Sequence, residues 1–355
     1  MNTQHTTLTS FLDDSSQGLP SAGSLVTLML TIADIIKEIS ALTEKGSLGD
    51  IYGKLESQNV QGETQMKLDV ISNQIFIDNL TQCGLVAGLA SEEMDAPVPI
   101  ACDSNRGEFL VVFDPLDGSS NVAVNVAIGS IFSILDAPKG RAPEDSDYLQ
   151  PGNRQVAAGY ALYGPCTMLV LTVGRGTHGF TLDRDKNTFM LTHPNMSIPE
   201  DTAEYAINDS NERFWDPPVK NYIAECKSGA AGARKKDFNL RWVASMVADI
   251  HRILMRGGVY LYPKDKKDVT KPGRLRLMYE ANPMAMLVEQ AGGLASTGRL
   301  KILDIQPEAI HQRVPVITGS RNEVLYIERY HTAYDNGADE ILPLFNERSF
   351  YRESI

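Results

Sequence analysis

Apolar side chains recur at helical spacing in several stretches of the chain. Residues 25–42 have the clearest pattern, with Leu, Ile or Met at every third or fourth position. This spacing predicts one long helix with an apolar face against a core. The same period predicts helices over about 65–80, 240–256 and 278–291, and the last is followed by Gly292 and Gly293, which are typical of a left-handed helix end.

Short apolar or alternating runs lie between these helices and predict strands. Residues 85–90 and 109–113 are too short for helices and are bounded by polar residues, which predicts buried strands. Further short runs predict strands over 126–135, 156–163, 168–173, 179–182, 188–192 and 259–262. The polar segment 136–155 predicts a long loop, and 194–204 predicts a linker between two lobes.

Length and charge narrow the class of protein. The chain has 355 residues, above the ceiling of roughly 250–300 residues for one hydrophobic core, so we expect two lobes that share a cleft, over 1–197 and 198–355. A net charge of −12 disfavours a nucleic acid or an anionic membrane as partner.

No basic leader precedes Lys37 and no apolar run approaches the ~18 residues of a membrane helix, so we expect a cytoplasmic protein. The four cysteines lie far apart and predict neither a zinc site nor a disulfide framework.

The strongest chemical signal is the segment 114–121, which follows the predicted strand 109–113. It carries two carboxylates, Asp114 and Asp117, and we expect Pro115 to end the strand. If the small residues after Asp117 open a helix, their N–H groups can bind phosphate, and carboxylates beside a phosphate suit Mg²⁺. An Asp-Gly pair by itself would indicate only an ordinary turn.

A second acidic cluster makes the ordinary turn a poor explanation. Glu92 and Glu93 follow the predicted strand 85–90, and ligand sites of α/β proteins lie at the carboxyl ends of strands. Glu63 and Asp69, near the start of the helix at 65–80, extend this acidic set. Neighbouring carboxylates raise one another's pKa. Two or three divalent cations would relieve that repulsion and could also hold a phosphoryl group.

One motif points to a different function. Residues 174–179 match the glycine pattern of a dinucleotide-binding loop, which must open a helix. The residues that follow predict another short strand instead. We therefore interpret this motif as a hairpin turn.

Motifs spread in order over residues 20–325 resemble class I fructose-1,6-bisphosphatases, of the superfamily that also contains inositol monophosphatase. The resemblance rests on residues 114–121, 129–134, 150–152, 157–164, 205–208, 241–252, 275–284, 290–293 and 303–305. It implies an α/β protein with a layered α/β/α/β/α fold and a homotetrameric assembly. The implied reaction is Mg²⁺-dependent hydrolysis of the 1-phosphate of D-fructose 1,6-bisphosphate to fructose 6-phosphate, a step of gluconeogenesis.

The resemblance also implies roles for individual residues. Two or three Mg²⁺ ions, for which Mn²⁺ can substitute, are expected on Glu92, Asp114, the Leu116 carbonyl, Asp117, Glu280 and Glu63, the last standing where the family has Asp. Glu93 and Asp69 match the pair that orients and deprotonates the attacking water. The 1-phosphate is expected on Asp117, Gly118, Ser119 and Ser120. The sugar and 6-phosphate are expected on Asn208, Arg241, Met246, Tyr262 and Arg274, with Arg241 reaching in from a neighbouring subunit.

Several positions depart from the family pattern. Arg274 replaces a usual Lys, which changes the geometry of the cation. Trp242 replaces a usual Tyr, so one hydroxyl donor is lost. The positions that bind AMP in inhibited members correspond to acidic or apolar residues, which predicts weak or absent AMP inhibition: Ala22, Val26, Glu108, Phe109 and Asp136. Segment 136–155 has no Cys, which argues against the thiol-switched plastid form.

Alternatives remain at this point. The same metal site would serve a sedoheptulose-1,7-bisphosphatase or another sugar or inositol phosphate phosphatase. The chain could also be a non-catalytic sensor of metal or phosphate, although it keeps every proposed ligand. Arg241 could form only a helix-surface ion pair, and Arg274 could lie in a solvated basic turn.

Overall fold

A computed structural model describes residues 6–49, 54–58, 64–100 and 107–337. Its largest sheet has eight strands in the order β10-β9-β8-β7-β6-β5-β3-β4, antiparallel except between β3 and β5. Their bounds are β3 Val86–Ser91, β4 Val98–Pro99, β5 Phe109–Asp117, β6 Ile128–Asp136, β7 Ala157–Tyr163, β8 Thr167–Thr172, β9 Thr177–Asp183 and β10 Thr188–Met196.

A second sheet has five short strands in the order β12-β11-β13-β17-β15. They are β11 Glu204–Ala206, β12 Asn239–Leu240, β13 Val259–Tyr262, β15 Leu294–Ser296 and β17 Val316–Gly319. Two ribbons of two strands complete the strand pairing in the described residues: β1 Lys54–Gln58 with β2 Thr64–Met66, and β14 Leu275–Arg276 with β16 Arg313–Val314.

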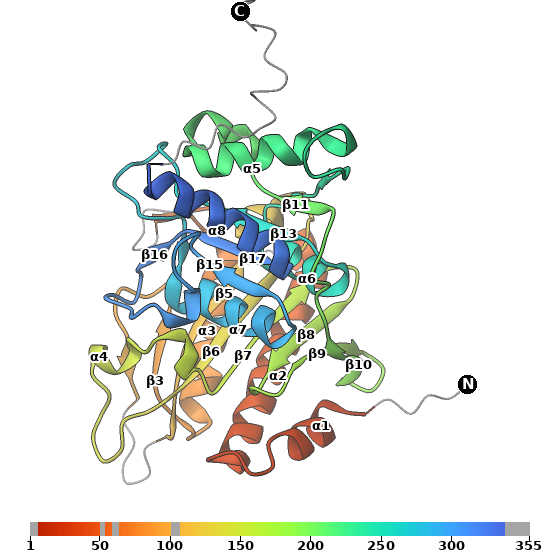
Figure 1. The fold of residues 1–355 in the computed structure, drawn as a ribbon. Coiled ribbons are helices and arrows are strands. Elements are labelled where there is room, and N and C mark those ends of the chain that lie inside the picture. The colour runs from red at the N-terminus through yellow and green to blue at the C-terminus, as the bar shows by residue number, and fades with distance from the viewer. Residues whose placement is uncertain (1–5, 50–53, 59–63, 101–106, 338–355) are drawn as a thin grey trace, which may run out of the picture.

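Helices and sheets alternate in five layers. On one face of the large sheet, an apolar core packs the helices α1 Leu8–Ser15, α2 Ala22–Lys45 and α3 Lys67–Gln82. Between the two sheets, a second core contains α6 Met246–Arg256 and α7 Asn282–Gln290. The far face of the small sheet is covered by α5 Pro217–Lys227 and α8 Arg321–Asp335. Figure 1 shows these two helices at the end of the molecule opposite α1 and α2, so the expected α/β/α/β/α layering is confirmed.

Three of the elements predicted from the hydrophobic pattern are present in the structure. The helix expected at 25–42 is α2, the helix expected at 65–80 is α3, and the strand expected at 259–262 is β13. Residues 173–176 form the turn between antiparallel β8 and β9, with Gly174 and Gly176 at φ of 80° and 83°. The interpretation of the glycine motif as a hairpin turn is therefore confirmed.

The prediction that Pro115 ends its strand is wrong, because β5 continues through Pro115 to Asp117. Asp114 pairs with Ile131 and Asp117 with Gly129, so β5 carries one extra residue opposite β6. Such a bulge accommodates a proline, which has no N–H to give to the ladder. The Ser130 hydroxyl donates to the Pro115 carbonyl at 2.7 Å and fixes the bulge.

Three other expectations need correction. The helix expected from 240 begins only at Met246, because 239–240 pair as β12 and Ala244 takes a left-handed φ of 65°. The helix expected from 278 is α7, preceded by a π-helical turn over Leu277–Ala281 and followed by Gly292 at φ 86°. The loop expected over 136–155 contains the short helix α4, Asp145–Tyr148, because Tyr148 turns inward to complete an apolar cluster.

Candidate active site

The two acidic motifs lie at the same edge of the large sheet. Strands β3 and β5 are parallel neighbours, with Ser91 opposite Phe113. Glu92, the first residue after β3, therefore lies beside Asp114 of β5, and the Glu92 N–H donates to the Phe113 carbonyl at 3.1 Å. This parallel pairing brings together two motifs that are separate in the sequence.

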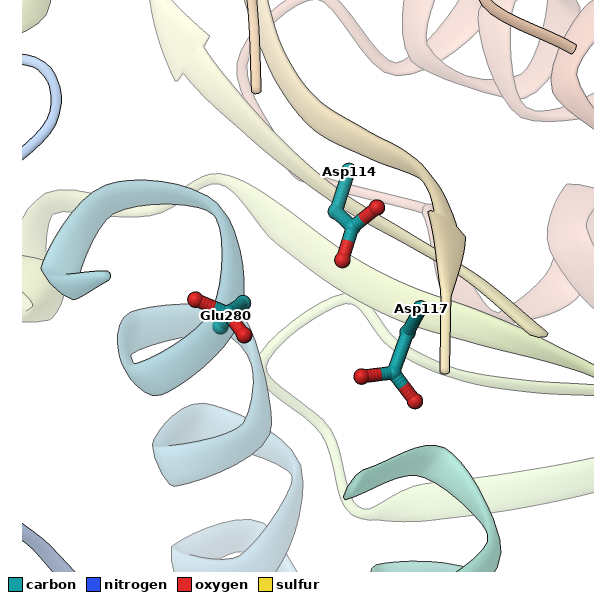
Figure 2. A group of neighbouring side chains, drawn as sticks. All are labelled: Asp114, Asp117 and Glu280. Atoms are coloured by element: carbon teal, nitrogen blue, oxygen red, sulfur yellow. The ribbon is translucent and has the colours of Figure 1, made fainter. Parts of the chain in front are cut away.

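Three buried carboxylates converge at this edge. Asp114 and Asp117 come from the bulged end of β5, and Glu280 comes from the π-helical turn before α7 (Figure 2). One oxygen from each lies within 4.8 Å of the others, and all three side chains are buried. Single π-helical turns inside helices are frequent at functional sites.

Backbone and side-chain donors hold each of these carboxylates in place. Asp117 Oδ2 accepts from the Ser245 hydroxyl at 2.9 Å and from the Val247 N–H at 3.0 Å. Asp114 Oδ1 accepts from the Leu116 N–H at 2.9 Å. Glu280 Oε2 accepts from the Arg276 N–H at 2.5 Å. The carboxylates are therefore positioned by β5 itself, the start of α6 and strand β14.

Burial and mutual repulsion oppose ionisation of the three carboxylates. Burial raises the pKa of Asp114 well above its usual range, and the negative charges of Glu92, Asp117 and Glu280 add to the effect. Burial likewise raises the pKa of Asp117, and that of Glu280 to about 8. A bound divalent cation would favour the ionised form of these carboxyl groups and lower their pKa values. Carboxylate oxygens are also the ligands that Mg²⁺ prefers. The donor set therefore fits such an ion.

Arg276, for which no role was predicted, supplies a positive charge beside the three carboxylates. Its Nη2 lies 2.5 Å from Glu92 Oε1, and its Nη1 lies 3.7 Å from Glu280 Oε2. The side chain is buried with the two carboxylates. The four-residue separation of Arg276 from Glu280 is the one sequence signal that could have indicated this pair.

A cavity of about 430 Å³ opens above the cluster. Residues 118–120 form one wall, where Gly118 has φ 77° and any Cβ would lie 2.9 Å from Ser245 Cβ. Only glycine fits there, so the chain can turn into the 3₁₀ helix Ser119–Val124. This turn brings two small hydroxyl side chains, Ser119 and Ser120, to the cavity.

Aromatic side chains form another wall of the cavity. Trp242 stacks on Tyr260, with ring centroids 5.7 Å apart, and meets Tyr262 edge-on at 5.9 Å. Ala244, also in this wall, holds a left-handed backbone conformation that non-glycine residues rarely adopt. Strained backbone of this kind concentrates at functional sites.

Comparison with known proteins identifies the family of this fold. The N-terminal domain model of fructose-1,6-bisphosphatase matches residues 6–194, and the C-terminal domain model matches 198–332. The chain belongs to the fructose-1,6-bisphosphatase family.

Solved structures of this family from Leishmania major superpose on nearly the whole chain. The holo form of that fructose-1,6-bisphosphatase is 40% identical, with a TM-score of 0.86, over 92% of this chain and 99% of the other. The apo form (39% identical) and the T-state form (40% identical) cover the same shares with TM-scores of 0.81. The relationship therefore extends over both sheets.

Most of the residues expected at the site of a fructose-1,6-bisphosphatase line this one cavity. They are Asp69, Glu92, Glu93, Asp114, Leu116, Asp117, Gly118, Ser119, Ser120, Asn208, Met246, Tyr262 and Glu280. The other residues in the lining are Trp242, Ala244, Tyr260, Leu275 and Arg276.

Two expected site residues lie outside this lining, and a third is not among the described residues. Arg241 is about half exposed, outside the cavity lining, and its Nε lies 3.7 Å from Glu204 Oε1. Arg274 also lies outside the lining, with its Nη2 3.3 Å from Asp265 Oδ1. Glu63 falls outside the described residues.

The buried carboxylates give this family member a predictable pH dependence. The pKa of Glu280 is about 8 in the folded protein, against an ordinary value of 4.5. Between these values the folded protein holds a proton that the unfolded chain has released, so the free energy of unfolding without metal falls as the pH rises toward 8. Denaturant unfolding in EDTA should show this slope, and saturating Mg²⁺, which binds the ionised form, should flatten it.

Glu280→Gln provides the control for this experiment, because the amide does not titrate. Its unfolding free energy in EDTA should fall less with pH than that of the unchanged protein. Equal slopes with and without Mg²⁺ in the unchanged protein would show that these carboxylates do not bind the ion.

Proposed function

We propose that this chain is a divalent-cation-dependent phosphatase that converts D-fructose 1,6-bisphosphate to fructose 6-phosphate and phosphate, a reaction of gluconeogenesis. The observation that carries the proposal is the convergence of Asp114, Asp117 and Glu280 beside the small-residue turn at 118–120. Hard oxygen donors next to a wall that can receive a phosphate are what metal-assisted phosphoryl transfer requires.

Two or three Mg²⁺ ions, with Mn²⁺ as a substitute, form the proposed cofactor. The residues that would hold them are Glu92, Asp114, the Leu116 carbonyl, Asp117, Glu280 and Glu63. When bound, such ions neutralise phosphoryl oxygens and lower the pKa of coordinated water. Arg276, beside Glu92 and Glu280, adds a fixed positive charge at the same place.

Glu93 and Asp69 are the proposed groups that orient the attacking water and accept its proton. Both line the cavity. Asp69 is fixed in the first turn of α3, where its Oδ2 accepts from the Met66 N–H at 2.7 Å. The Glu93 N–H donates to the Ser91 hydroxyl at 3.2 Å, which fixes the turn that carries Glu93. A fixed pair of carboxylates can aim a water molecule in line with the phosphorus.

The two ends of the substrate would contact different lobes. We assign the 1-phosphate to Asp117, Gly118, Ser119 and Ser120, in the lobe spanning 1–197. We assign the sugar and the 6-phosphate to Asn208, Met246, Tyr262 and Arg274, in the lobe spanning 198–355. Trp242 offers an indole N–H and a flat ring in place of the usual Tyr hydroxyl, next to Tyr262.

A homotetramer is the proposed assembly, with Arg241 contributed to a neighbouring subunit's 6-phosphate site. Its side chain is half exposed and does not line the cavity of its own chain.

We also propose a cytoplasmic location. The three cysteines in the described part of the chain, Cys83, Cys166 and Cys226, are free thiols, as in reducing compartments. Within the described ranges, no helix is long and apolar enough to span a bilayer.

AMP is expected to inhibit this enzyme weakly or not at all. At the start of α2, where inhibited relatives bind AMP, Glu108 already accepts from the Ser24 hydroxyl at 2.9 Å, and hydrogen bonds from Ser21 and Ser24 lower the pKa of Glu108. This carboxylate would repel a phosphate. Initial rates of fructose 1,6-bisphosphate hydrolysis should be unchanged by AMP up to millimolar concentrations, and low-micromolar inhibition would contradict this prediction.

Phosphate release from a small substrate panel tests the proposed function. Fructose 1,6-bisphosphate, sedoheptulose 1,7-bisphosphate and inositol 1-phosphate would each be titrated with Mg²⁺. We expect the highest kcat/KM for the six-carbon bisphosphate and no release in EDTA. A preference for another substrate would change the assignment, and no release at any Mg²⁺ concentration would favour the non-catalytic sensor.

A further inference from the structure

A second cavity, of about 610 Å³, lies in the C-terminal half of the fold and shares no lining residue with the active cavity. Its walls come from Pro263 and Lys264 after β13, the turn at 297–300 after β15, residues 312–315 around β16, and His331 of α8. A volume of this size accommodates a small organic ligand.

The cavity wall contains a buried histidine, His331, which is 5% exposed. Neither Nδ1 nor Nε2 has a hydrogen-bond partner among the described residues, and both atoms are themselves buried. The ring packs against Gly298, where a Cβ would lie 2.4 Å from His331 Cδ2. The imidazole therefore contributes a ring surface to the wall rather than a hydrogen-bonding atom.

The charges in the lining favour an anion. The lining contains the cations Lys264, Arg299 and Arg313 against the carboxylates of Asp216 and Glu308, although the whole chain carries a net charge of −12. Asp216 is paired with Lys266, outside the lining, at 3.2 Å. Lys264 is exposed and makes no ion pair with any described residue.

The remaining wall is apolar and is fixed before any ligand enters. Proline, leucine, isoleucine and valine side chains line it, among them Pro272, Leu300 and Ile305. The Arg299 guanidinium pairs with both oxygens of Asp335 at 2.6 Å, and Arg313 Nη1 donates to the Arg274 carbonyl at 2.7 Å. A preformed pocket costs a ligand less ordering entropy.

We propose that this cavity is a binding site for a small organic anion with an apolar body, with its carboxylate or phosphate near Lys264 and its body between the apolar wall and His331. The site is separate from the reaction centre and does not depend on the proposed function.

Binding of 2-naphthoate, a carboxylate that cannot be hydrolysed, tests the proposal. The chain has six histidines, so the His331 ring signal can be identified in a histidine-selective NMR spectrum by its loss in His331→Gln. We expect a saturable shift of that signal. Calorimetry should show at least about tenfold weaker binding to Lys264→Glu, as for loss of a hydrogen bond to a charged group.

Lys267→Glu is the matched control, because it makes the same charge change on an exposed lysine outside the lining. It should alter the affinity by less than about twofold, as for a screened surface charge. Either of two results would overturn the proposal: no saturable shift of the His331 signal, or equal weakening by Lys264→Glu and Lys267→Glu. Both substitutions lie on the surface, so folding does not complicate the comparison.

Discussion

Asp114→Asn should lower kcat for fructose 1,6-bisphosphate by about 10³-fold, the loss expected when one preorganised group stops stabilising transition-state charge. The same substitution should raise the free energy of unfolding in EDTA, because burial and neighbouring carboxylates raise the pKa of Asp114 and make its ionised form costly. An Asn oxygen can still accept the Leu116 N–H. Steady-state rates and thermal unfolding, each with EDTA and with Mg²⁺, measure both effects.

Asp136→Asn is the control for this substitution. Asp136 is the exposed last residue of β6, opposite Phe109 at the other end of β5 from Asp114, and does not line the cavity. Its variant should keep both the rate and the stabilisation by Mg²⁺. If Asp114→Asn turned over at a near-normal rate, or were stabilised by Mg²⁺ as strongly as the unchanged protein, Asp114 would not be a metal ligand.

Glu93→Gln should lower kcat by about 10²- to 10⁴-fold, the range for loss of a general base. We expect KM and the Mg²⁺ concentration for half-maximal rate to change little, because the proposed ligands are other residues. The amide keeps the size of the side chain, so the fold should persist. The full dependence of rate on substrate and Mg²⁺ separates loss of the base from loss of the metal.

The neighbouring exposed carboxylate provides a matched comparison. Asp95 lies two residues further along the same turn and outside the cavity lining. Asp95→Asn should retain nearly full activity. A Glu93→Gln protein that is equally active would remove Glu93 from the mechanism, whereas one with a greatly raised Mg²⁺ requirement would make Glu93 a ligand instead.

The sequence predicts the fold best where the burial of one face of an element requires a regular spacing of apolar residues. Residues 25–42 bury one continuous stripe, and the strands of the large sheet are short apolar runs, so pattern and structure agree. Prediction fails where a local contact overrides the pattern. The bulge at Pro115 depends on the register of β5 against β6, and the late start of α6 depends on β12 pairing with β11. Neither the register of β5 on β6 nor the pairing of β12 with β11 can be identified from the local sequence.

The active site, like the fold, could be predicted from the sequence only in part. The acidic motifs at the ends of β3 and β5 could be predicted to meet because each comes directly after a buried apolar run, and parallel pairing places these ends together. The place of Glu280 came from family resemblance, since no spacing in the sequence connects it to Asp114. Arg276 was missed because its importance depends on a tertiary contact with Glu92. Long-range contacts of this kind leave no local pattern.

Anomalous diffraction from crystals grown with Mn²⁺ and shown to hydrolyse substrate tests most directly whether the three carboxylates bind the catalytic cation. We expect a manganese peak coordinated jointly by the carboxylates of Asp114, Asp117 and Glu280, within the cavity that also contains Glu93. In Asp114→Asn crystals that peak should weaken or vanish. An active crystal with no manganese between these three carboxylates, or with its only peak outside this cavity, would contradict the account.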